Sequence, residues 1–300
     1  MPTYIGTSGW SYPSGEGKWK GIFYPARWKG DELAYYAERF PAVEVNSTFY
    51  RLPSVSTVNS WIERTPPGFL FTAKLYRKFT HPDFYARETG QLPEITTEDI
   101  ADMRAVLDAL MEQNRLGAVL AQFPEFHRKT AETTAALVRL LDAFRNYPLA
   151  VEIRHPSWQT GETREILEGF NAALARIDEP FFSNLDDPVA PKHTLQYWRF
   201  HGRNAAEWRK KDAGLRKYDY LYTIDEIDDI THLVDKFATP SGKNFLFFNN
   251  HLHSKAVVNA VEMAKAMDMD LPYGKFADLS TLYPELSDIT GPTGGQLGLL

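Results

Sequence analysis

Polar side chains that can do chemistry alternate with apolar ones in short segments of the chain. In the segment VEVNSTFYRLPS, Glu44 and Asn46 alternate with Val43 and Val45. Successive residues of a strand point to opposite faces, so the carboxylate and the amide share one face. A buried charge is costly unless it is paired or binds a ligand. This segment therefore predicts either a structural ion pair or a ligand site.

The same alternation recurs in further apolar segments along the chain. If their apolar residues pack outward, the polar residues share one inner face. The polar residues placed inward in this way are Thr72, Lys74, Gln122, Glu152, Arg154, Arg199, His201 and Arg203. In the segment FLFFNNH the parity stays open, because either Asn249 and His251 or Asn250 can point inward.

The charges on this inner face are predicted to be unequal. Its cations are Lys74, Arg154, Arg199 and Arg203, and its acids are Glu44 and Glu152. Asp186, near the end of another apolar segment, can reduce the positive excess. The remaining positive charge favours an anionic ligand, whereas a purely structural pair of Glu44 with Arg199 is the alternative.

The apolar segments themselves indicate the fold. Strands are expected at 4–10, 42–49, 69–76, 116–123, 149–155, 180–186, 197–203 and 244–251, and helical patterns lie between most of them. This order predicts one TIM-type (β/α)8 barrel over residues 1–288, followed by a flexible tail at 289–300. An open doubly wound sheet is the alternative, although no Gly-x-Gly-x-x-Gly follows the first strand. Long segments at 11–29, 76–96 and 203–222 would lie at the C-terminal face, where barrel enzymes carry their sites.

Loops at this face supply further candidate binding residues. Ser8 follows the first strand and precedes Gly9, so their N–H groups are expected either to meet an anion or to form a simple turn. Trp10, Tyr12 and Trp158 are expected to wall the pocket. Although histidines follow the last strand, the chain has no His-x-x-x-His spacing, so no metal ligands are assigned and the cofactor is left open.

Two other segments suggest macromolecular partners. The segment 203–222 interleaves arginines and lysines with tyrosines and a tryptophan, which suits phosphate contact and base stacking; a solvated loop is the alternative. The residues QLGLL at 296–300 are similar to the short peptide by which bacterial repair proteins bind the sliding clamp. A tail that packs on the barrel is the alternative there.

The composition narrows the classes of protein. The chain has 300 residues, of which 43% are hydrophobic, and its net charge is −6. It contains no cysteine, which excludes disulfides and a cysteine nucleophile. No apolar run approaches the length of a membrane span, and no basic leader precedes the first strand. A cytoplasmic protein without membrane contact is expected.

Several motifs together resemble a known family. The stretches IGTSGWSYP, VEVNSTFYRLP, TAKLYRKFTH, AQFP, VEIRHPSW, RFHGR and FNNHLHSKAVVNA follow one another in the order of the YecE-like family, domain of unknown function 72. The resemblance implies a TIM-type barrel and supplies no reaction. Similarity of the family's barrel to metal-dependent endonucleases implies DNA binding, but the His-rich metal pattern of those nucleases is missing here.

Three functional hypotheses follow from these residues. The first is a hydrolase, lyase or isomerase that acts on a phosphorylated or carboxylated substrate. Lys74, Arg154 and Arg203 would bind the anion, Glu152 or Glu44 would act as general base, and His201 as general acid or base. The second is a nucleic-acid-binding, repair-associated protein. The third is a sensor that binds a metabolite without turnover.

Overall fold

The computed structural model describes residues 2–91, 93–187, 194–210, 212–239 and 241–291. The strands are β1 Thr3–Thr7, β2 Ala42–Val45, β3 Leu70–Lys74, β4 Leu116–Gln122, β5 Leu149–Glu152, β6 Ala173–Leu174, β7 Arg176–Glu179, β8 Phe182–Ser183, β9 Leu195–Phe200 and β10 Lys243–Phe248. The α-helices are α1 Glu32–Ala37, α2 Ser47–Tyr50, α3 Val55–Glu63, α4 Arg77–Thr80, α5 Pro82–Thr89, α6 Thr97–Glu112, α7 Ala131–Ala143, α8 Gly161–Gly169, α9 Ala205–Trp208, α10 Ile224–Phe237, α11 Lys255–Ala266 and α12 Ser287–Thr290. Short 3-10 helices are η1 Pro156–Trp158, η2 Gly214–Tyr218, η3 Leu252–Ser254, η4 Tyr273–Thr281 and η5 Pro284–Leu286.

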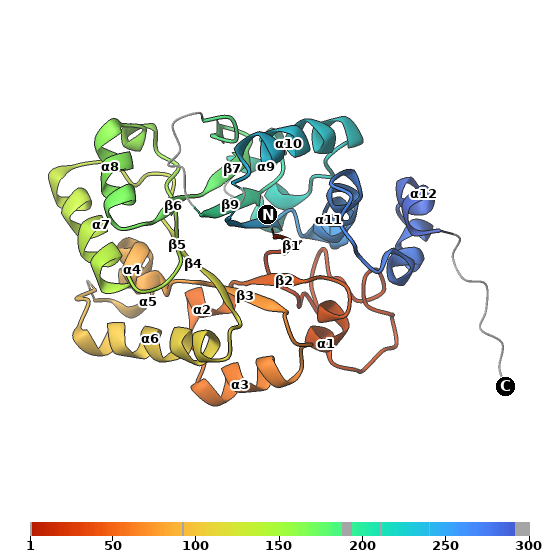
Figure 1. The fold of residues 1–300 in the computed structure, drawn as a ribbon, viewed down its shortest axis with the longest axis horizontal. Coiled ribbons are helices and arrows are strands. Elements are labelled where there is room, and N and C mark those ends of the chain that lie inside the picture. Colours follow the sequence, from red (N-terminus) through yellow and green to blue (C-terminus); the bar gives the residue numbers. More distant parts are fainter. Residues whose placement is uncertain (1, 92, 188–193, 211, 240, 292–300) are drawn as a thin grey trace.

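The strands form two parallel-rich sheets, and the helices lie outside them (Figure 1). One sheet has the order β1-β10-β9-β7-β8 and the other has the order β2-β3-β4-β5-β6. All neighbours are parallel except β7 and the short β8, which form a hairpin. The predicted alternation of strands and helices is thus confirmed, and the fold is a mixed α/β fold. The strands, however, are divided between two sheets.

Two connections bring the edges of these sheets together. Ser8, directly after β1, and Glu44, within β2, form an isolated parallel bridge, and the Gly9 N–H donates to the Glu44 carbonyl at 2.8 Å. On the other side, the chain leaves β6 in one sheet and enters β7 in the other within a single residue, Ala175. The inner faces of the two sheets therefore lie against each other.

The predicted alternation of inward and outward residues is borne out by two separate apolar clusters. Val43, Val45 and Phe71 belong to the larger cluster, which the strands share with the surrounding helices. Ala42 and Leu70, at neighbouring positions of the same strands, belong to a smaller cluster between the sheets. Buried apolar side chains of this kind are the main source of folding free energy, so the pattern fixes which face of each strand turns inward.

The helices begin where the sequence provides caps. Thr96, Thr130 and Thr223 each accept a hydrogen bond from the third residue of the following helix, and that residue bonds back. Such caps satisfy backbone N–H groups that have no partner inside a helix, and losing one typically costs about 1 kcal/mol. They begin α6, α7 and α10, which are the longest helices in the connections that follow β3, β4 and β9.

The sixth predicted strand is displaced. Expected at 180–186, it lies at β7, Arg176–Glu179, and residues 182–183 form the returning strand β8. Residues 173–174, which lie between the fifth and sixth expected strands, form β6. The reason is that the segment RIDE buries charged side chains, which an apolar pattern does not reveal.

The predicted C-terminal tail at 289–300 begins inside a helix. Residues 289 and 290 belong to α12 rather than to a tail, and the rest of the expected tail beyond 291, including 296–300, lies outside the described residues. Within the described part of the chain, no helix is both long and apolar enough to span a membrane.

Candidate functional site

A fully buried ion-pair network lies between the two sheets. Arg199, on β9, binds both acids that the sequence placed inward. Its Nε and Nη2 contact the Glu44 carboxylate at 2.9 and 2.7 Å, and its Nη1 contacts Glu152 at 2.5 Å. Tyr197, also on β9, donates to Glu44 at 2.7 Å. Because every carboxylate oxygen here has a donor, the cost of burying the charges is compensated.

Arg154 extends this network toward the protein surface. Its Nε donates to Glu152 at 2.7 Å, and its Nη1 lies 2.9 Å from a Glu179 oxygen. Burial alone would raise the pKa of Glu152, but the guanidinium groups of Arg154 and Arg199 hold it well below its usual range. Burial raises the pKa of Glu179 to about 7, against the opposing effect of Arg154. Glu152 is thus a permanent anion, and a carboxylate this acidic is a weak base near neutral pH.

His201 is held in one protonation state by the same arginines. Its Nε2 lies 3.2 Å from Arg154 Nη2 and 3.3 Å from Arg199 Nη1. Both arginine nitrogens are donors, so Nε2 accepts and the ring proton belongs on Nδ1. The Asn249 amide, 2.9 Å from Nδ1, then presents its oxygen to this proton. Burial, followed by the charges of Arg154 and Arg199, lowers the pKa of His201 well below its usual range. A neutral imidazole whose lone pair is occupied has little freedom to act as a base.

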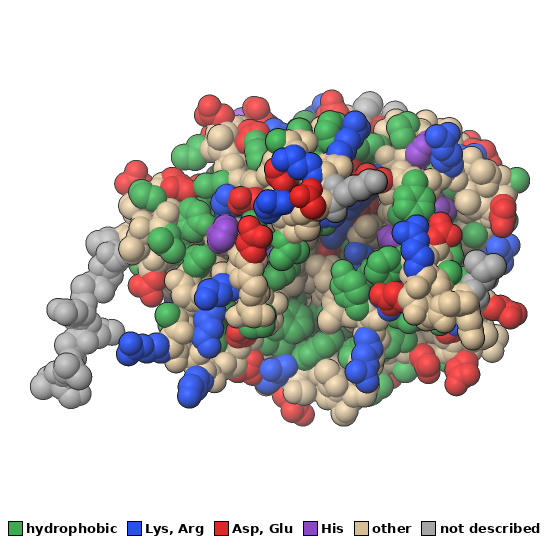
Figure 2. All heavy atoms as spheres, turned by 180° about the vertical axis from the view of Figure 1, so that it is seen from behind, with side chains coloured by type: hydrophobic (Ala, Val, Ile, Leu, Met, Phe, Trp, Pro, Cys, Tyr) green, Lys and Arg blue, Asp and Glu red, His purple; other side chains and the backbone are tan. Residues whose placement is uncertain are grey.

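Above this network lies a cavity of about 640 Å³, within the usual range for small-molecule sites. It is lined by Tyr12, Asn46, Phe49, Tyr50, Lys74, His81, Phe84, Gln122, Pro124, Glu125, Phe126, Arg154, Arg199, His201, Leu215, Lys217, Tyr218, Asn249 and His251. One face of the molecule is hollowed near its middle, and hydrophobic as well as Lys or Arg side chains lie around the hollow (Figure 2).

The polar residues of the cavity come from the carboxyl ends of several strands. Lys74 and Gln122 are the last residues of β3 and β4. Asn46, His201 and Asn249 each follow a strand directly, namely β2, β9 and β10. In parallel sheets these ends meet on one side, which is where α/β proteins place their sites. The open parity of FLFFNNH is thereby settled, since Asn249 and His251 line the cavity.

Lys74 differs from the other cations of the site. Among the described residues, no carboxylate lies within ion-pair distance of its ammonium, which sits 4.3 Å from the centre of the Phe49 ring. Burial and then the positive charge of Arg199 lower the pKa of Lys74 to about 7. The amine is therefore divided between its charged and neutral forms near neutral pH.

An amide next to Lys74 has unused bonding capacity. Asn46 follows β2, which pairs in parallel with β3, so Asn46 and Lys74 lie at corresponding places in neighbouring strands. The side-chain oxygen of Asn46 is buried and has no hydrogen-bond partner within the described chain. A buried acceptor without a partner is unfavourable unless a ligand or water completes it.

Two histidines beside the cavity are neutral. Burial and the charge of Lys74 lower the pKa of His81 to about 3, and its Nδ1 lies 2.9 Å from the Thr80 hydroxyl. His251 donates from Nδ1 to the Asn249 carbonyl at 2.9 Å and stacks on Tyr12 with ring centres 4.5 Å apart. Across the described residues, no group of three or more His, Asp or Glu side chains is placed to hold a metal ion.

The structure brings nine of the fifteen residues that the sequence assigned to a site into or directly beneath the cavity. The assigned residues that line the cavity are Tyr12, Asn46, Lys74, Gln122, Arg154, His201 and Asn249. Glu44 and Glu152 lie directly beneath it, where both contact Arg199. The remaining assigned residues lie elsewhere, and they are Ser8, Trp10, Trp158, Asp186, Arg203 and Asn250.

After the first strand, the anion site, one of two alternatives for the Ser8 and Gly9 N–H groups, is not formed. The Ser8 N–H donates to the Phe248 carbonyl at 2.9 Å and the Gly9 N–H donates to Glu44, so neither is free for a ligand. Trp10 packs edge-on against Trp61 with ring centres 5.7 Å apart, on the helix side of the sheet. Tyr12 is the residue of this loop that lines the cavity.

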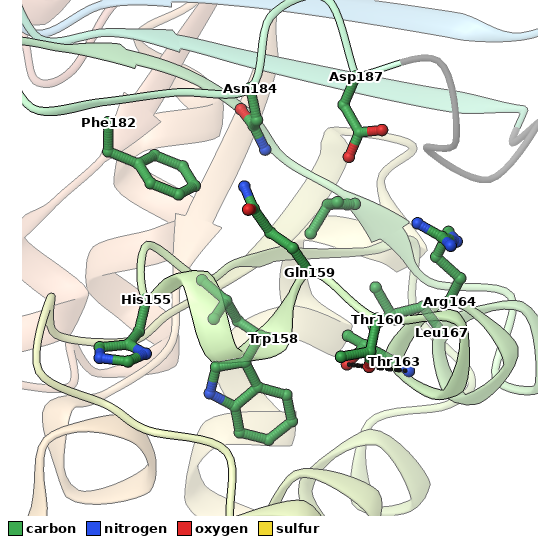
Figure 3. A pocket seen from close by; sticks show the side chains of 12 residues that line it. His155, Trp158, Gln159, Thr160, Thr163, Arg164, Leu167, Phe182, Asn184 and Asp187 are labelled. Carbon is green, nitrogen blue, oxygen red and sulfur yellow. Dashed lines mark hydrogen bonds between the residues drawn. The ribbon is translucent and has the colours of Figure 1, made fainter.

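Trp158 lines a different and much smaller cavity, shown with His155, Gln159 and Asn184 in Figure 3. Its volume is about 20 Å³, room for roughly one water molecule. The Trp158 indole donates to the His127 carbonyl at 2.7 Å. The tryptophan therefore supports a loop and does not wall the main cavity.

Arg203, Asp186 and Asn250 were also misplaced by sequence reasoning. Arg203 contacts Asp178 and Glu226, each at 2.7 Å, and points away from the cavity. Asp186 is exposed beyond the displaced sixth strand. The Asn250 amide donates to the Tyr220 carbonyl and to Asn259, each at 2.8 Å, and so fastens a loop to α11.

Sequence reasoning missed several residues of the cavity. His81, Lys217 and Tyr218 line it but were not assigned to it. All three lie in the long segments 76–96 and 203–222, whose length and position were the available signals. Glu179, which pairs with Arg154, was hidden because its strand was placed wrongly.

The basic segment 203–222 neutralises much of its own charge. Lys210 forms an ion pair with Glu207, and Arg216 lies 3.6 Å from the same carboxylate. Arg209 stacks on Phe181 at 3.7 Å. Lys217 turns toward the cavity and lies near the rings of Trp208 and Tyr218. Within the part of this segment that the structure describes, Lys210 and Arg216 are thus paired with an acid of the same segment.

The fold and the site define the class: an α/β protein of two parallel-rich sheets, with a polar cavity at the strand ends above a buried ion-pair network. The model of the family "Protein of unknown function DUF72" matches residues 4–276, and the chain belongs to this family, which confirms the resemblance seen in the sequence motifs.

Relatives and solved structures agree with this assignment. The UPF0759 protein YunF of Bacillus subtilis is 28% identical over 279 residues, covering 89% of this chain and 95% of YunF. The UPF0759 protein YecE of Escherichia coli K12 is 28% identical over 166 residues, 55% of this chain and 53% of YecE. A crystal structure of a DUF72 family protein from Thermotoga maritima has 31% identity and a TM-score of 0.74, covering 89% of this chain and all of that one. An Enterococcus faecalis DUF72 protein, 24% identical, covers 89% of this chain and 96% of its own, with a TM-score of 0.73, and supports the fold alone.

Proposed function

We propose that this protein is an enzyme that acts on a small anionic substrate in the cavity, with Lys74 as its acid–base residue. The observation that carries the proposal is the ammonium of Lys74, which faces the cavity with no carboxylate partner in the described chain. An amine that gains and loses its proton near pH 7 can transfer protons in both directions. Hydrolase, lyase and isomerase chemistry all fit, and proton abstraction beside a carbonyl suits such an amine best.

The arrangement of charges supports an anionic substrate. The acids of the site, Glu44, Glu152 and Glu179, lie buried behind Arg154 and Arg199. A ligand in the cavity therefore meets cations first, and the positive charge of Lys217 adds to them. Glu125 is the acid of the lining, and its side chain is 57% exposed at the edge. Fixed charges of this kind favour a carboxylate or a phosphate group.

We also propose that the two sheets act as the two halves of one closed TIM-type (β/α)8 barrel. The bridge between Ser8 and Glu44 and the direct passage from β6 to β7 support this geometry. The cavity would then be the mouth of the barrel at its C-terminal face.

Binding and turnover test the enzyme proposal together. Titration calorimetry with inorganic phosphate and with pyruvate is expected to show binding that weakens at least about tenfold in Lys74→Met, since a buried-site charge contact is lost. Substitution of an exposed lysine, Lys243→Met, is the matched control and should bind as the wild type does. A substrate screen should give turnover that Lys74→Met loses. Binding without turnover would make the protein a sensor, and no binding of either anion would contradict the proposal.

A second candidate function, binding of single-stranded nucleic acid, is favoured by aromatic rings at the cavity. Tyr50, Phe84 and Phe126 line it and are 59%, 38% and 64% exposed. Exposed rings can stack on bases, and Lys217 could then meet a phosphate. Affinity for an oligonucleotide should fall steeply with salt and drop in a Tyr50→Ala, Phe126→Ala double variant. Salt-independent or absent binding would remove this candidate.

A further inference from the structure

Lys74 stands among groups that favour the neutral form of its amine. Arg199 and Arg154 approach it from β9 and from the loop after β5, while the carboxylates of Glu44 and Glu152, which would oppose them, are occupied by those arginines. The Phe49 ring lies 4.3 Å from the ammonium and shields it from water, although this cation–π contact by itself favours the charged form. A lysine that is partly desolvated and close to other cations has the setting in which amines serve as nucleophiles.

We infer that Lys74 is a nucleophile that forms an imine with small anionic carbonyl compounds, such as 2-oxo acids. The inference rests on the proposed function and names its substrate class. The anionic group of such a compound contacts Lys217 and is attracted by the charge of Arg154, whose nitrogens already face Glu152, Glu179 and His201. Asn46, whose side-chain oxygen has no partner in the described chain, accepts a hydrogen bond from the intermediate.

The chemistry balances without a further reactant. The neutral Lys74 amine attacks the carbonyl carbon, the nitrogen gives up one proton as the carbonyl oxygen takes one, and a neutral carbinolamine forms. A second proton is taken up by the hydroxyl group, which leaves as water while the nitrogen lone pair forms the C=N bond. The product is a protonated imine, so the positive charge of Lys74 is kept. This charge withdraws electrons from the former carbonyl carbon, which eases proton loss or bond cleavage at the adjacent carbon.

Reductive trapping of the full chain tests the inference directly. The protein is incubated at pH 7 with glyoxylate or pyruvate and with sodium borohydride, which reduces an imine irreversibly to a secondary amine. Peptide mapping by mass spectrometry then locates the adduct. With its pKa lowered to about 7, Lys74 has a neutral fraction about a thousandfold above that of an ordinary lysine. Lower basicity offsets part of this advantage, so trapping is expected at least about tenfold faster than at Lys217.

Controls separate the contribution of the compound's negative charge from the contribution of the Lys74 amine. Lys217 lines the same cavity and is the matched internal standard. Acetaldehyde, which carries no charge, should label Lys74 with less preference than glyoxylate does. Lys74→Arg keeps the positive charge but cannot form an imine, and it should lose the dominant adduct. Equal labelling of Lys74 and exposed lysines, or no adduct at Lys74 with either acid, would overturn the inference.

Phosphate binding distinguishes failure of the imine inference from failure of the proposed enzyme function. Inorganic phosphate has no carbonyl group, so its affinity reports the cations of the cavity alone. Phosphate binding that depends on Lys74, together with no trapping at Lys74, would remove the imine and leave the anion-binding enzyme. Loss of both would remove both proposals.

Discussion

Two groups of inward-facing polar residues lie within one molecule and behave in opposite ways. Between the sheets, Glu44, Arg199 and Glu152 satisfy one another, and each is almost completely buried. At the strand ends, Lys74 and the side-chain oxygen of Asn46 lack such partners in the described residues. The comparison shows that strand parity places a polar group inside, whereas its depth along the strand decides whether neighbouring side chains satisfy it.

The largest effect is expected from breaking the deep network. Arg199→Met leaves Glu44 and Glu152 buried without their shared cation, which should cost about 3–5 kcal/mol of the free energy of unfolding. Urea unfolding followed by circular dichroism measures this loss. Lys74→Met is the matched control and should not destabilise the protein at pH 7. Comparable losses in the two variants would contradict the division into a structural and a functional group.

The next effect concerns the pH dependence of stability. In the folded protein the pKa of Lys74 is lowered from 10.5 to about 7. Between these pH values the unfolded chain binds more protons than the folded one, so stability rises with pH in this window. Below pH 7 the amine is protonated in both states and its unfavourable contribution is constant.

Lys74→Met should lack this rise. Relative to the variant, the wild type is expected to gain about 2 kcal/mol in the free energy of unfolding between pH 7 and pH 10, after allowance for partial solvent exposure. Unfolding curves at several pH values measure the difference, in which the titration of other groups cancels. Lys243→Met should retain the whole rise. Parallel profiles for wild type and Lys74→Met would show that Lys74 is not desolvated.

Whether the sequence could predict which polar residues face inward depended on the kind of segment. Regular alternation, as in VEVN and FTAK, placed Glu44, Asn46, Thr72 and Lys74 on the correct face, because apolar residues on the opposite parity must pack outward. Where charges replaced apolar residues, as in RIDE, the strand itself was missed, and with it Asp178 and Glu179.

Loop residues could not be placed in this way. Arg203 continues the inward parity of its strand in sequence, but the strand ends at Phe200 and the chain turns at Gly202, which has a φ of +88°. That left-handed conformation favours glycine and reverses the direction of the next side chain. Trp158 and His81 likewise depend on loop paths that no periodicity describes.

A smaller effect would sharpen the description of the deep network. Tyr197 donates to Glu44 at 2.7 Å, and its hydroxyl lies 2.9 Å from that of Thr72. Tyr197→Phe should cost about 1.5 kcal/mol, the lower end for a hydrogen bond to a charged group, because Arg199 still binds Glu44. Tyr218→Phe is the control, since Tyr218 lines the cavity and, among the residues that the structure describes, its hydroxyl has no such bond to a buried carboxylate. Equal stability of the two variants would mean that Glu44 does not need the tyrosine.

The smallest effect is expected at Arg203, which sequence parity assigned to the site. Its side chain is 36% exposed and contacts Asp178 and Glu226 outside the cavity. Arg203→Gln should cost only about 1 kcal/mol, since Tyr222 still donates to Asp178 at 2.8 Å. Phosphate binding should be unchanged, in contrast to Lys74→Met. Arg203→Gln could instead weaken phosphate binding as strongly as Lys74→Met does. Position along the strand would then not separate structural from ligand-binding cations. The site would also extend to the region between β7 and α10.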